Sequence, residues 1–213
     1  MQTWGMGGNF VDYRLFFDTK EGFKMSVVEL YATSKCNHSC NHCYLTYESI
    51  WNPDVLIDTT KSLFEQGYTV RINGAEILTN PDYLKAYKVC KQNFLFTNGI
   101  LLADGNSYLF DNMKKNDIDT IRISHHFDSI EVLNGVPSDI IERAIYNTQK
   151  NGISTELHTT ITSLTYDKVE TMCDYSYEKK CPRIKFFFSY ASGKWEKTSF
   201  RTFSFNGAKK IFL

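Results

Sequence analysis

Several features common in secreted, membrane and nucleic-acid-binding proteins are missing from this sequence of 213 residues. The first ten residues have neither the cationic nor the apolar segment of a secretory signal, and no apolar run approaches the length that crosses a bilayer. Basic and acidic residues balance at 24 each, so the basic excess typical of a DNA or tRNA binder is also absent. We therefore expect a cytoplasmic protein with no membrane and no nucleic-acid partner.

Metal-ligand patterns are scarce outside one segment. No CxxC or HxxxH follows residue 43, so the two separated ligand pairs of a typical zinc site are missing. Three of the six cysteines, Cys90, Cys173 and Cys181, have no metal-ligand spacing. We expect Cys90 and Cys173 to lie on apolar stripes of helices, and Cys181 to lie in a loop without a role. With no mark of secretion, all six are expected to be reduced.

The other three cysteines form one cluster, Cys36-Asn-His-Ser-Cys40-Asn-His-Cys43. The spacing CxxxCxxC supplies three thiolates from one loop, whereas an electron-transfer iron–sulfur cluster normally takes four. One iron would keep no protein ligand, and an open coordination position is typical of metal centres that do chemistry. A zinc site that includes His38 or His42, or a disulfide, are the alternatives.

This loop resembles the defining motif of the radical S-adenosylmethionine (SAM) enzymes. The resemblance implies that Cys36, Cys40 and Cys43 hold a 4Fe-4S cluster whose fourth iron is chelated by the amino and carboxylate groups of SAM. One electron, from a reductant such as flavodoxin or ferredoxin, would then split SAM into methionine and a 5′-deoxyadenosyl radical that abstracts hydrogen from the substrate. His42 takes the place of the family's usual aromatic residue near the adenine, and Tyr44 completes a CxxxCxxCY ending, so both are expected to contact the cofactor.

Short β-rich runs predict six strands, at residues 27–31, 69–72, 94–97, 120–124, 154–160 and 183–189. Helical patterns separate them, with these expected ends: Asp58 as N-cap and Gly67 as stop, Asn80-Pro81 as a start, and a helix over 138–150 ended by Gly152. Strands that alternate with helices imply a parallel sheet with right-handed crossovers. The fold class is therefore α/β, a partial TIM barrel of six units, (β/α)6, which is also the core fold of the family.

Three regions are expected along the chain. An N-terminal extension over 1–26 contains a probable hairpin, with a strand at 13–17 and a turn near Glu21-Gly22. The barrel core covers 27–194, and a C-terminal tail covers 195–213. No cysteine follows Cys181, so the sequence predicts a minimal core without the auxiliary-cluster (SPASM or twitch) domain of many relatives.

Further candidate residues lie at or just beyond the ends of predicted strands. Gly74-Ala75-Glu76 is similar to the family's GGE segment, which receives the SAM amino group, provided that Ala75 has a negative φ. Asn98 lies in a Thr-Asn-Gly turn that resembles the family's TNG turn but would suit any tight turn. Ser124 matches a serine that contacts the SAM ribose or carboxylate, and Tyr190 is expected to stack near the adenine. His125 and His126 are candidates for a substrate pocket, although a histidine at the start of a loop is more often a surface or capping residue.

Polar and apolar residues alternate within the strands, which is unusual for parallel strands covered on both faces. One face carries Glu29, Tyr31, Arg71, Asn73, Arg122, Ser124, Glu156, His158 and Thr160, and the other carries Val28, Leu30, Val70, Ile72, Ile121, Ile123 and Leu157. The polar face either lines a substrate cavity, with Glu156 and His158 as candidate catalytic residues, or forms a buried network of Glu29 and Glu156 with Arg71 and Arg122. Residues near the strand ends, such as Ser124 and Thr160, are the stronger candidates for ligand contact.

The resemblance predicts an enzyme that modifies its substrate by hydrogen abstraction, and a ribosomally made peptide is our first hypothesis for that substrate. A glycyl-radical-enzyme activase, acting on a protein partner, is an alternative within the same family. A non-catalytic protein that binds an iron–sulfur cluster or zinc is an alternative of a different class.

Overall fold

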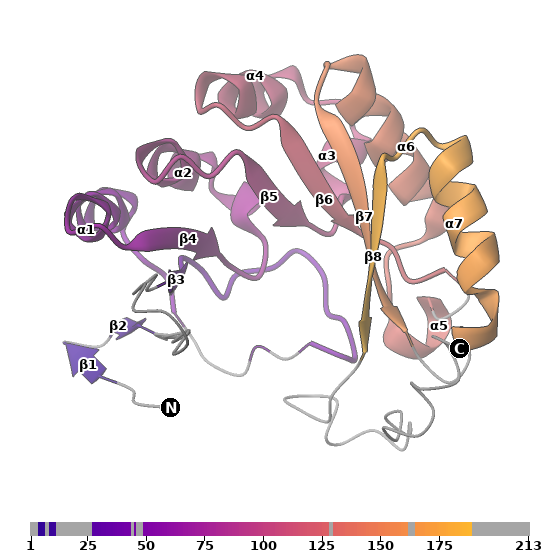
Figure 1. Ribbon diagram of the computed structural model, residues 1–213, viewed down its shortest axis with the longest axis horizontal. Coiled ribbons are helices and arrows are strands. Elements are labelled where there is room, and N and C mark those ends of the chain that lie inside the picture. The colour runs from indigo at the N-terminus through magenta and orange to yellow at the C-terminus, as the bar shows by residue number, and fades with distance from the viewer. Residues whose placement is uncertain are drawn as a thin grey trace, which may run out of the picture. The chain divides into compact units, whose positions relative to one another are not determined.

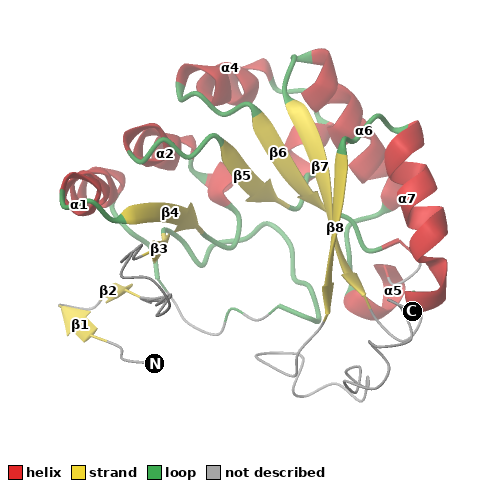
Figure 2. Cartoon of the chain, in the orientation of Figure 1, coloured by secondary structure: helices red, strands yellow, loops and turns green. Residues whose placement is uncertain are grey.

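The computed structural model describes residues 4–6, 9–11, 27–43, 45, 49–127, 130–161 and 165–188. Strands alternate with helices along most of this chain (Figures 1 and 2). The strands are β1 (Trp4–Met6), β2 (Asn9–Val11), β3 (Val27–Tyr31), β4 (Thr69–Asn73), β5 (Phe94–Thr97), β6 (Thr120–Ser124), β7 (Ser154–Ile161) and β8 (Arg183–Phe188). The α-helices are α1 (Pro53–Glu65), α2 (Leu84–Val89), α3 (Ile100–Ala103), α4 (Ser107–Lys115), α5 (Ile130–Leu133), α6 (Ser138–Lys150) and α7 (Val169–Glu178). Short 3-10 helices are η1 (Ile77–Thr79), η2 (Pro81–Tyr83) and η4 (Tyr166–Lys168). None of these helices is long and apolar enough to cross a bilayer.

The six predicted core strands are present as β3 to β8, with ends that differ by at most a residue from those expected. β3 pairs in parallel with β4, β6 with β7, and β7 with β8, which confirms an α/β fold with parallel sheets. The hairpin expected over residues 13–22 lies outside the described residues. An antiparallel pair does occur earlier, between β1 and β2.

The chain divides into two compact units, each described by itself. Unit 1 comprises residues 1–36, 47–96 and 107–119, and unit 2 comprises residues 37–46, 97–106 and 120–213. The division crosses the cysteine segment directly after Cys36.

In unit 1, helix α1 packs on β4 and α2, and it buries Leu56 completely. Its start corrects the sequence prediction. Asn52, not Asp58, is the N-cap, and its side-chain oxygen accepts a hydrogen bond from Asp54 N at 2.9 Å. Pro53 fits directly after the cap because proline has no amide hydrogen to leave unpaired. Gly67, with φ +85°, follows the helix end as expected.

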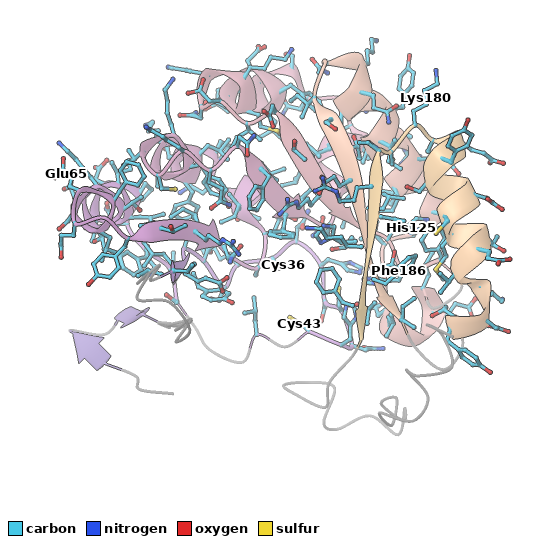
Figure 3. The ribbon with its side chains drawn as sticks, in the orientation of Figure 1. Cys36, Cys43, Glu65, His125, Lys180 and Phe186 are labelled. Atoms are coloured by element: carbon cyan, nitrogen blue, oxygen red, sulfur yellow. The ribbon has the colours of Figure 1, made fainter. Side chains whose placement is uncertain are left out.

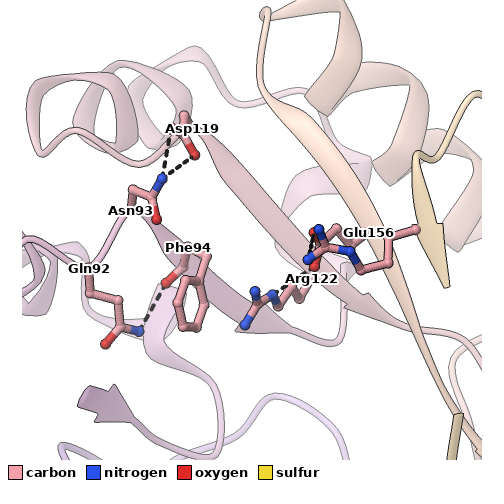
Figure 4. Close-up of polar contacts among 7 residues, drawn as sticks. Gln92, Asn93, Phe94, Asp119, Arg122 and Glu156 are labelled. Atoms are coloured by element: carbon pink, nitrogen blue, oxygen red, sulfur yellow. Dashed lines mark hydrogen bonds and ion pairs between the residues drawn. The ribbon is translucent and has the colours of Figure 1, made fainter. Parts of the chain in front are cut away.

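A buried glutamine carries part of the backbone hydrogen bonding of unit 1 (Figure 4). The Gln92 side chain accepts from Ile72 N at 2.8 Å and donates to Ile72 O at 3.1 Å and Phe94 O at 3.0 Å. An amide can donate and accept at once, so it links the ends of β4 and β5 as another peptide group would. Nothing in the local sequence pattern signalled this role.

In unit 2, helix α6 packs on β6 and β7, while α7 packs on β8 (Figure 1). The predicted bounds of α6 are confirmed, and its buried stripe consists of Ile141, Ala144, Ile145 and Thr148. Cys90, in unit 1, is buried as expected. The prediction for Cys173 on α7 was wrong, because this side chain is exposed.

Candidate cofactor site

The stem of the cysteine loop lies in unit 1, just beyond β3. Trp51 N donates to Ala32 O at 3.0 Å, and Ser34 N donates to Ser49 O at 2.7 Å. These bonds join the chain that enters the loop to the chain that leaves it. Tyr83 OH adds a bond of 2.9 Å to Trp51 O. The loop therefore begins and ends on backbone that is hydrogen-bonded in place.

The Gly74-Ala75-Glu76 segment runs along the other edge of this stem. Ala75 N donates to Thr33 O at 2.8 Å, and Glu76 N donates to Lys35 O at 3.1 Å, next to Cys36. A Cβ atom on Gly74 would lie 2.8 Å from Ile77 Cδ1 and 3.1 Å from Thr33 O, so the close approach of the two segments favours glycine there. Ala75 is not among the non-glycine residues with positive φ, as the comparison with a GGE segment requires.

Glu76 is fully buried, with no exposed surface. Its Oε1 accepts from Leu78 N at 3.2 Å and so caps η1, and Thr79 Oγ1 donates to its carbonyl oxygen at 2.7 Å. A carboxylate can accept more than one hydrogen bond. Glu76 therefore caps η1 through its side chain. Its backbone N–H is bonded to Lys35 O, the carbonyl of the residue just before Cys36.

The rest of the cysteine loop, residues 37–43, belongs to unit 2. Figure 3 labels Cys36 and Cys43, which begin and end the cysteine cluster. Cys36 is exposed, Cys40 and Cys43 are half-buried, and none of the three forms a disulfide. Among the residues that the structure describes, no three cysteine, histidine or carboxylate side chains already stand together at metal-binding distance. The donor set itself fits an iron–sulfur cluster, because thiolates are its usual ligands and three of them fall within eight residues.

The Thr97-Asn98-Gly99 turn contacts this loop directly. Asn98 Nδ2 donates to Asn37 Oδ1 at 2.7 Å, while Asn98 Oδ1 accepts from the backbone N–H of Ile100, the first residue of α3, at 3.0 Å. Gly99 has φ +83°, and a Cβ there would lie 3.2 Å from Ile123 Cγ2. The sequence left open whether this segment is a turn or a functional motif, and the structure shows a turn that also holds the neighbour of Cys36.

His42 packs edge-on against His126, with ring centroids 4.4 Å apart. Burial lowers the pKa of His42, and it lowers the pKa of His126 well below its usual value. Two imidazoles in contact avoid mutual repulsion when both are neutral. His42 therefore presents a neutral, flat ring in the loop beside Cys43.

His125 and His126 are both buried, so the surface alternative for these two histidines is wrong, and their place in a substrate pocket stays a prediction. The His125 ring stacks on Phe127 with centroids 4.0 Å apart, and burial lowers its pKa to about 4. Within the described part of the chain, its Nδ1 has no hydrogen-bond partner. His125 N donates to His158 O at 2.9 Å and extends the pairing of β6 with β7 past Ser124.

The polar strand face of unit 2 contains the buried charge network that the sequence allowed. Glu156 accepts from Arg122 Nε at 2.9 Å and pairs with Arg183 Nη1 at 2.8 Å (Figure 4). The side chains of Glu156 and Arg122 are 8% and 13% exposed, whereas that of Arg183 is 56% exposed. Arg71, expected in this network, is exposed instead, and sequence analysis missed Arg183. The apolar face is confirmed, with Val28, Leu30, Val70, Ile72, Ile121, Ile123 and Leu157 all buried.

Further along these strands, Ser124 of β6 is paired with His158 of β7, and His158 is paired with Lys185 of β8. The His158 ring lies 5.1 Å from that of Phe187, which is 48% exposed. Burial, together with Arg122, Lys185 and Arg183, lowers the pKa of His158 to about 3. His158 is therefore neutral at physiological pH, and Thr160 follows it on the same face, half-buried.

Solved structures with this arrangement of strands and helices exist, although no protein-family model and no curated protein sequence matches the chain. anSMEcpe with bound AdoMet and Kp18Cys peptide has a TM-score of 0.63 at 20% identity, over 77% of this chain and 51% of that one. TsrM, a radical S-adenosylmethionine methyltransferase from Kitasatospora setae with cobalamin and a [4Fe-4S] cluster bound, has a TM-score of 0.55 at 13% identity, over 76% of this chain and 36% of that one.

The chain has the fold of the radical SAM enzymes. It spans about half the length of anSMEcpe and about a third of TsrM. In parallel α/β folds, functional groups gather at the carboxyl ends of the strands. The cysteine loop follows β3, Glu76 follows β4, Asn98 follows β5, and Ser124 is the last residue of β6.

Two residues of the cysteine region were missed from the sequence, Asn37 and Asn134. Asn134 Nδ2 donates to Ser39 O, from a position 95 residues away in the sequence. The dipeptide Asn134-Gly135 was a readable turn signal. The hydrogen bond from Asn134 to Ser39 could not be predicted, because no local sequence pattern specifies a contact between residues 95 positions apart. Tyr44 and Tyr190, both expected to contact the cofactor, lie outside the described residues.

Proposed function

We propose that this protein is a radical SAM enzyme in which Cys36, Cys40 and Cys43 hold a 4Fe-4S cluster and SAM binds the remaining iron. One observation carries the proposal: the CxxxCxxC loop directly follows the first core strand of a radical SAM fold. Support comes from the Gly74–Glu76 segment, whose backbone bonds to Lys35 next to the first cysteine. The cluster, when bound, supplies the electron that cleaves SAM.

The chain's own residues would bind and orient SAM. Glu76 offers a buried carboxylate, which suits an ammonium because a charge-assisted hydrogen bond in low dielectric is strong. Ser124 offers a hydroxyl for the ribose or the carboxylate. His42 offers a neutral ring near Cys43 for the adenine, and Asn98 fixes Asn37 in the loop. As part of the same proposal, the six strand–helix units form a partial (β/α)6 barrel.

A peptide is the substrate class that we propose, modified through hydrogen abstraction by the 5′-deoxyadenosyl radical. Support comes from anSMEcpe, which was solved with a peptide bound. Activation of a glycyl-radical enzyme is the second candidate within the fold. We also propose a cytoplasmic location and a small redox protein as electron donor, because cysteines outside disulfides and a reducible cluster both suit a reducing compartment.

Anaerobic reconstitution with iron and sulfide tests the proposal. Wild type should bind about four irons per chain, and reduction with dithionite in the presence of SAM should yield 5′-deoxyadenosine. Cys40→Ala should abolish both. Cys173→Ala is the matched control, since Cys173 is likewise in no disulfide but lies outside the CxxxCxxC segment, and this variant should leave both unchanged.

Two results would contradict the proposal. Retention of a full cluster by Cys40→Ala would exclude these cysteines as the ligand set. Zinc as the sole bound metal, with no iron taken up, would instead support the non-catalytic alternative.

A further inference from the structure

The last residue of α5 and the turn after it contact the cysteine loop through hydrogen bonds that lie within unit 2. Asn134 Nδ2 donates to Ser39 O at 2.5 Å. Asn41 N donates to Leu133 O at 2.8 Å. His38 Nε2 donates to Asn134 O at 2.6 Å. Residues 38, 39 and 41 are spacer residues between the three cysteines, so these bonds hold the backbone that carries the thiols.

The conformation of Asn134 is that of a helix C-terminal turn. Its φ is +46°, its N–H donates to Glu131 O at 3.4 Å, and Gly135 N donates to Ile130 O at 2.7 Å. This pair of bonds is the Schellman motif, whose left-handed position favours glycine and, after it, asparagine. Glycine would therefore serve the turn at least as well. The bond to Ser39 is what the asparagine side chain adds.

The same turn also contacts the loop indirectly, through the side chain of His126. A Cβ atom on Gly135 would lie 3.1 Å from His126 Cδ2, and His126 packs edge-on against His42. His126 is buried. The turn therefore lies against the buried His126 ring, which in turn contacts His42 of the loop.

We propose that Asn134 is a positioning residue for the cluster: its side-chain amide holds the exposed loop so that the three thiols are presented together. This inference rests on the proposed function. Metal binding must order its ligands, and a loop that is already hydrogen-bonded loses less conformational freedom when the metal binds. Loss of the amide should therefore weaken the hold on iron.

Asn134→Gly isolates this role, because glycine keeps the left-handed turn and removes only the side-chain donor. The variant and wild type are reconstituted anaerobically, and iron loss to a chelator is followed over time. We expect about three- to tenfold faster loss, the effect of removing one hydrogen bond. The electron paramagnetic resonance spectrum of the reduced cluster should also broaden, while the melting temperature of the iron-free protein should stay within about 2 °C of wild type.

Two further variants serve as controls. Asn134→Asp keeps the shape of the side chain but has no N–H to donate, so it should lose iron as Asn134→Gly does. Lys180→Gly changes a matched turn after α7, where Lys180 has φ +55° and Cys181 N donates to Ser176 O at 2.9 Å. This turn and α5 lie at opposite ends of α7 (Figures 1 and 3). Lys180→Gly should therefore retain iron as wild type does.

The outcomes separate this inference from the proposed function. Iron loss from Asn134→Gly at the wild-type rate would overturn the inference alone. So would a large fall in the melting temperature of the iron-free variant, which would show a general structural role. A wild-type chain that binds no iron would overturn the proposed function and this inference together.

Discussion

Removing the carboxylate of Glu156 should destabilise the protein by about 3–5 kcal/mol, because it takes away the partner of an almost buried arginine. Glu156 is 8% exposed and bonds to Arg122, which is 13% exposed, at 2.9 Å. Its second partner, Arg183, is 56% exposed, so water screens that pair and it should add only about 0–1 kcal/mol. The loss of stability in Glu156→Ala is therefore attributed mainly to Arg122.

The measurement is urea unfolding followed by circular dichroism, with the midpoint and the slope both fitted. Arg183→Gln is the matched control: it removes the exposed partner and should cost less than about 1 kcal/mol. The double variant Arg122→Met with Glu156→Leu should lie within about 1 kcal/mol of wild type, because replacing a whole buried pair with apolar groups is often neutral or stabilising.

The reasoning would be refuted if Glu156→Ala unfolded within about 1 kcal/mol of wild type, or if Arg183→Gln cost as much as Glu156→Ala. A stable Glu156→Ala that bound SAM but failed to turn over its substrate would instead assign Glu156 to the substrate cavity.

Three other predictions follow from buried or crowded residues. Burial lowers the pKa of His125 to about 4 and of His158 to about 3, below the ordinary value of 6.5. Below about pH 6.5 these histidines therefore bind protons more readily in the unfolded chain than in the folded chain. Stability should be complete above about pH 6.5 and fall as the pH drops toward 3, and thermal melts should show a shallower fall for His125→Gln combined with His158→Gln. Glu76→Gln keeps an oxygen that accepts from Leu78 N but loses the negative charge. Isothermal titration of the cluster-loaded protein should therefore show SAM affinity weakened by about 1–3 kcal/mol, with the iron content unchanged. Equal affinity in the variant and wild type would exclude Glu76 as the acceptor for the SAM ammonium. Gly74→Ala places a Cβ 3.1 Å from Thr33 O and 2.8 Å from Ile77 Cδ1, so urea unfolding should show a loss of about 1–3 kcal/mol, and a wild-type midpoint would mean that the two segments separate easily.

The sequence by itself determined the features that depend on neighbours along the chain. The period of two in 120–124 and 154–160 placed strands and their faces correctly, because adjacent residues of a strand point to opposite sides. The stripe over 138–150 placed α6, since its period matches a helical turn. The cysteine spacing specified three thiols in one loop. The start of α1 was readable too, because Asn52-Pro53 is the same signal as the correctly read Asn80-Pro81, but it was overlooked.

Only the tertiary structure decided which distant residues meet. Glu156 bonds to Arg183 as well as to Arg122, His125 is buried, and Cys173 is exposed, because each outcome depends on which element packs against which face. Asn134 reaches Ser39 across 95 residues of sequence. A side chain's chemistry and its local backbone preference are written in the nearest few residues, whereas its partner is chosen by the packing of whole strands and helices, and no local pattern carries that choice.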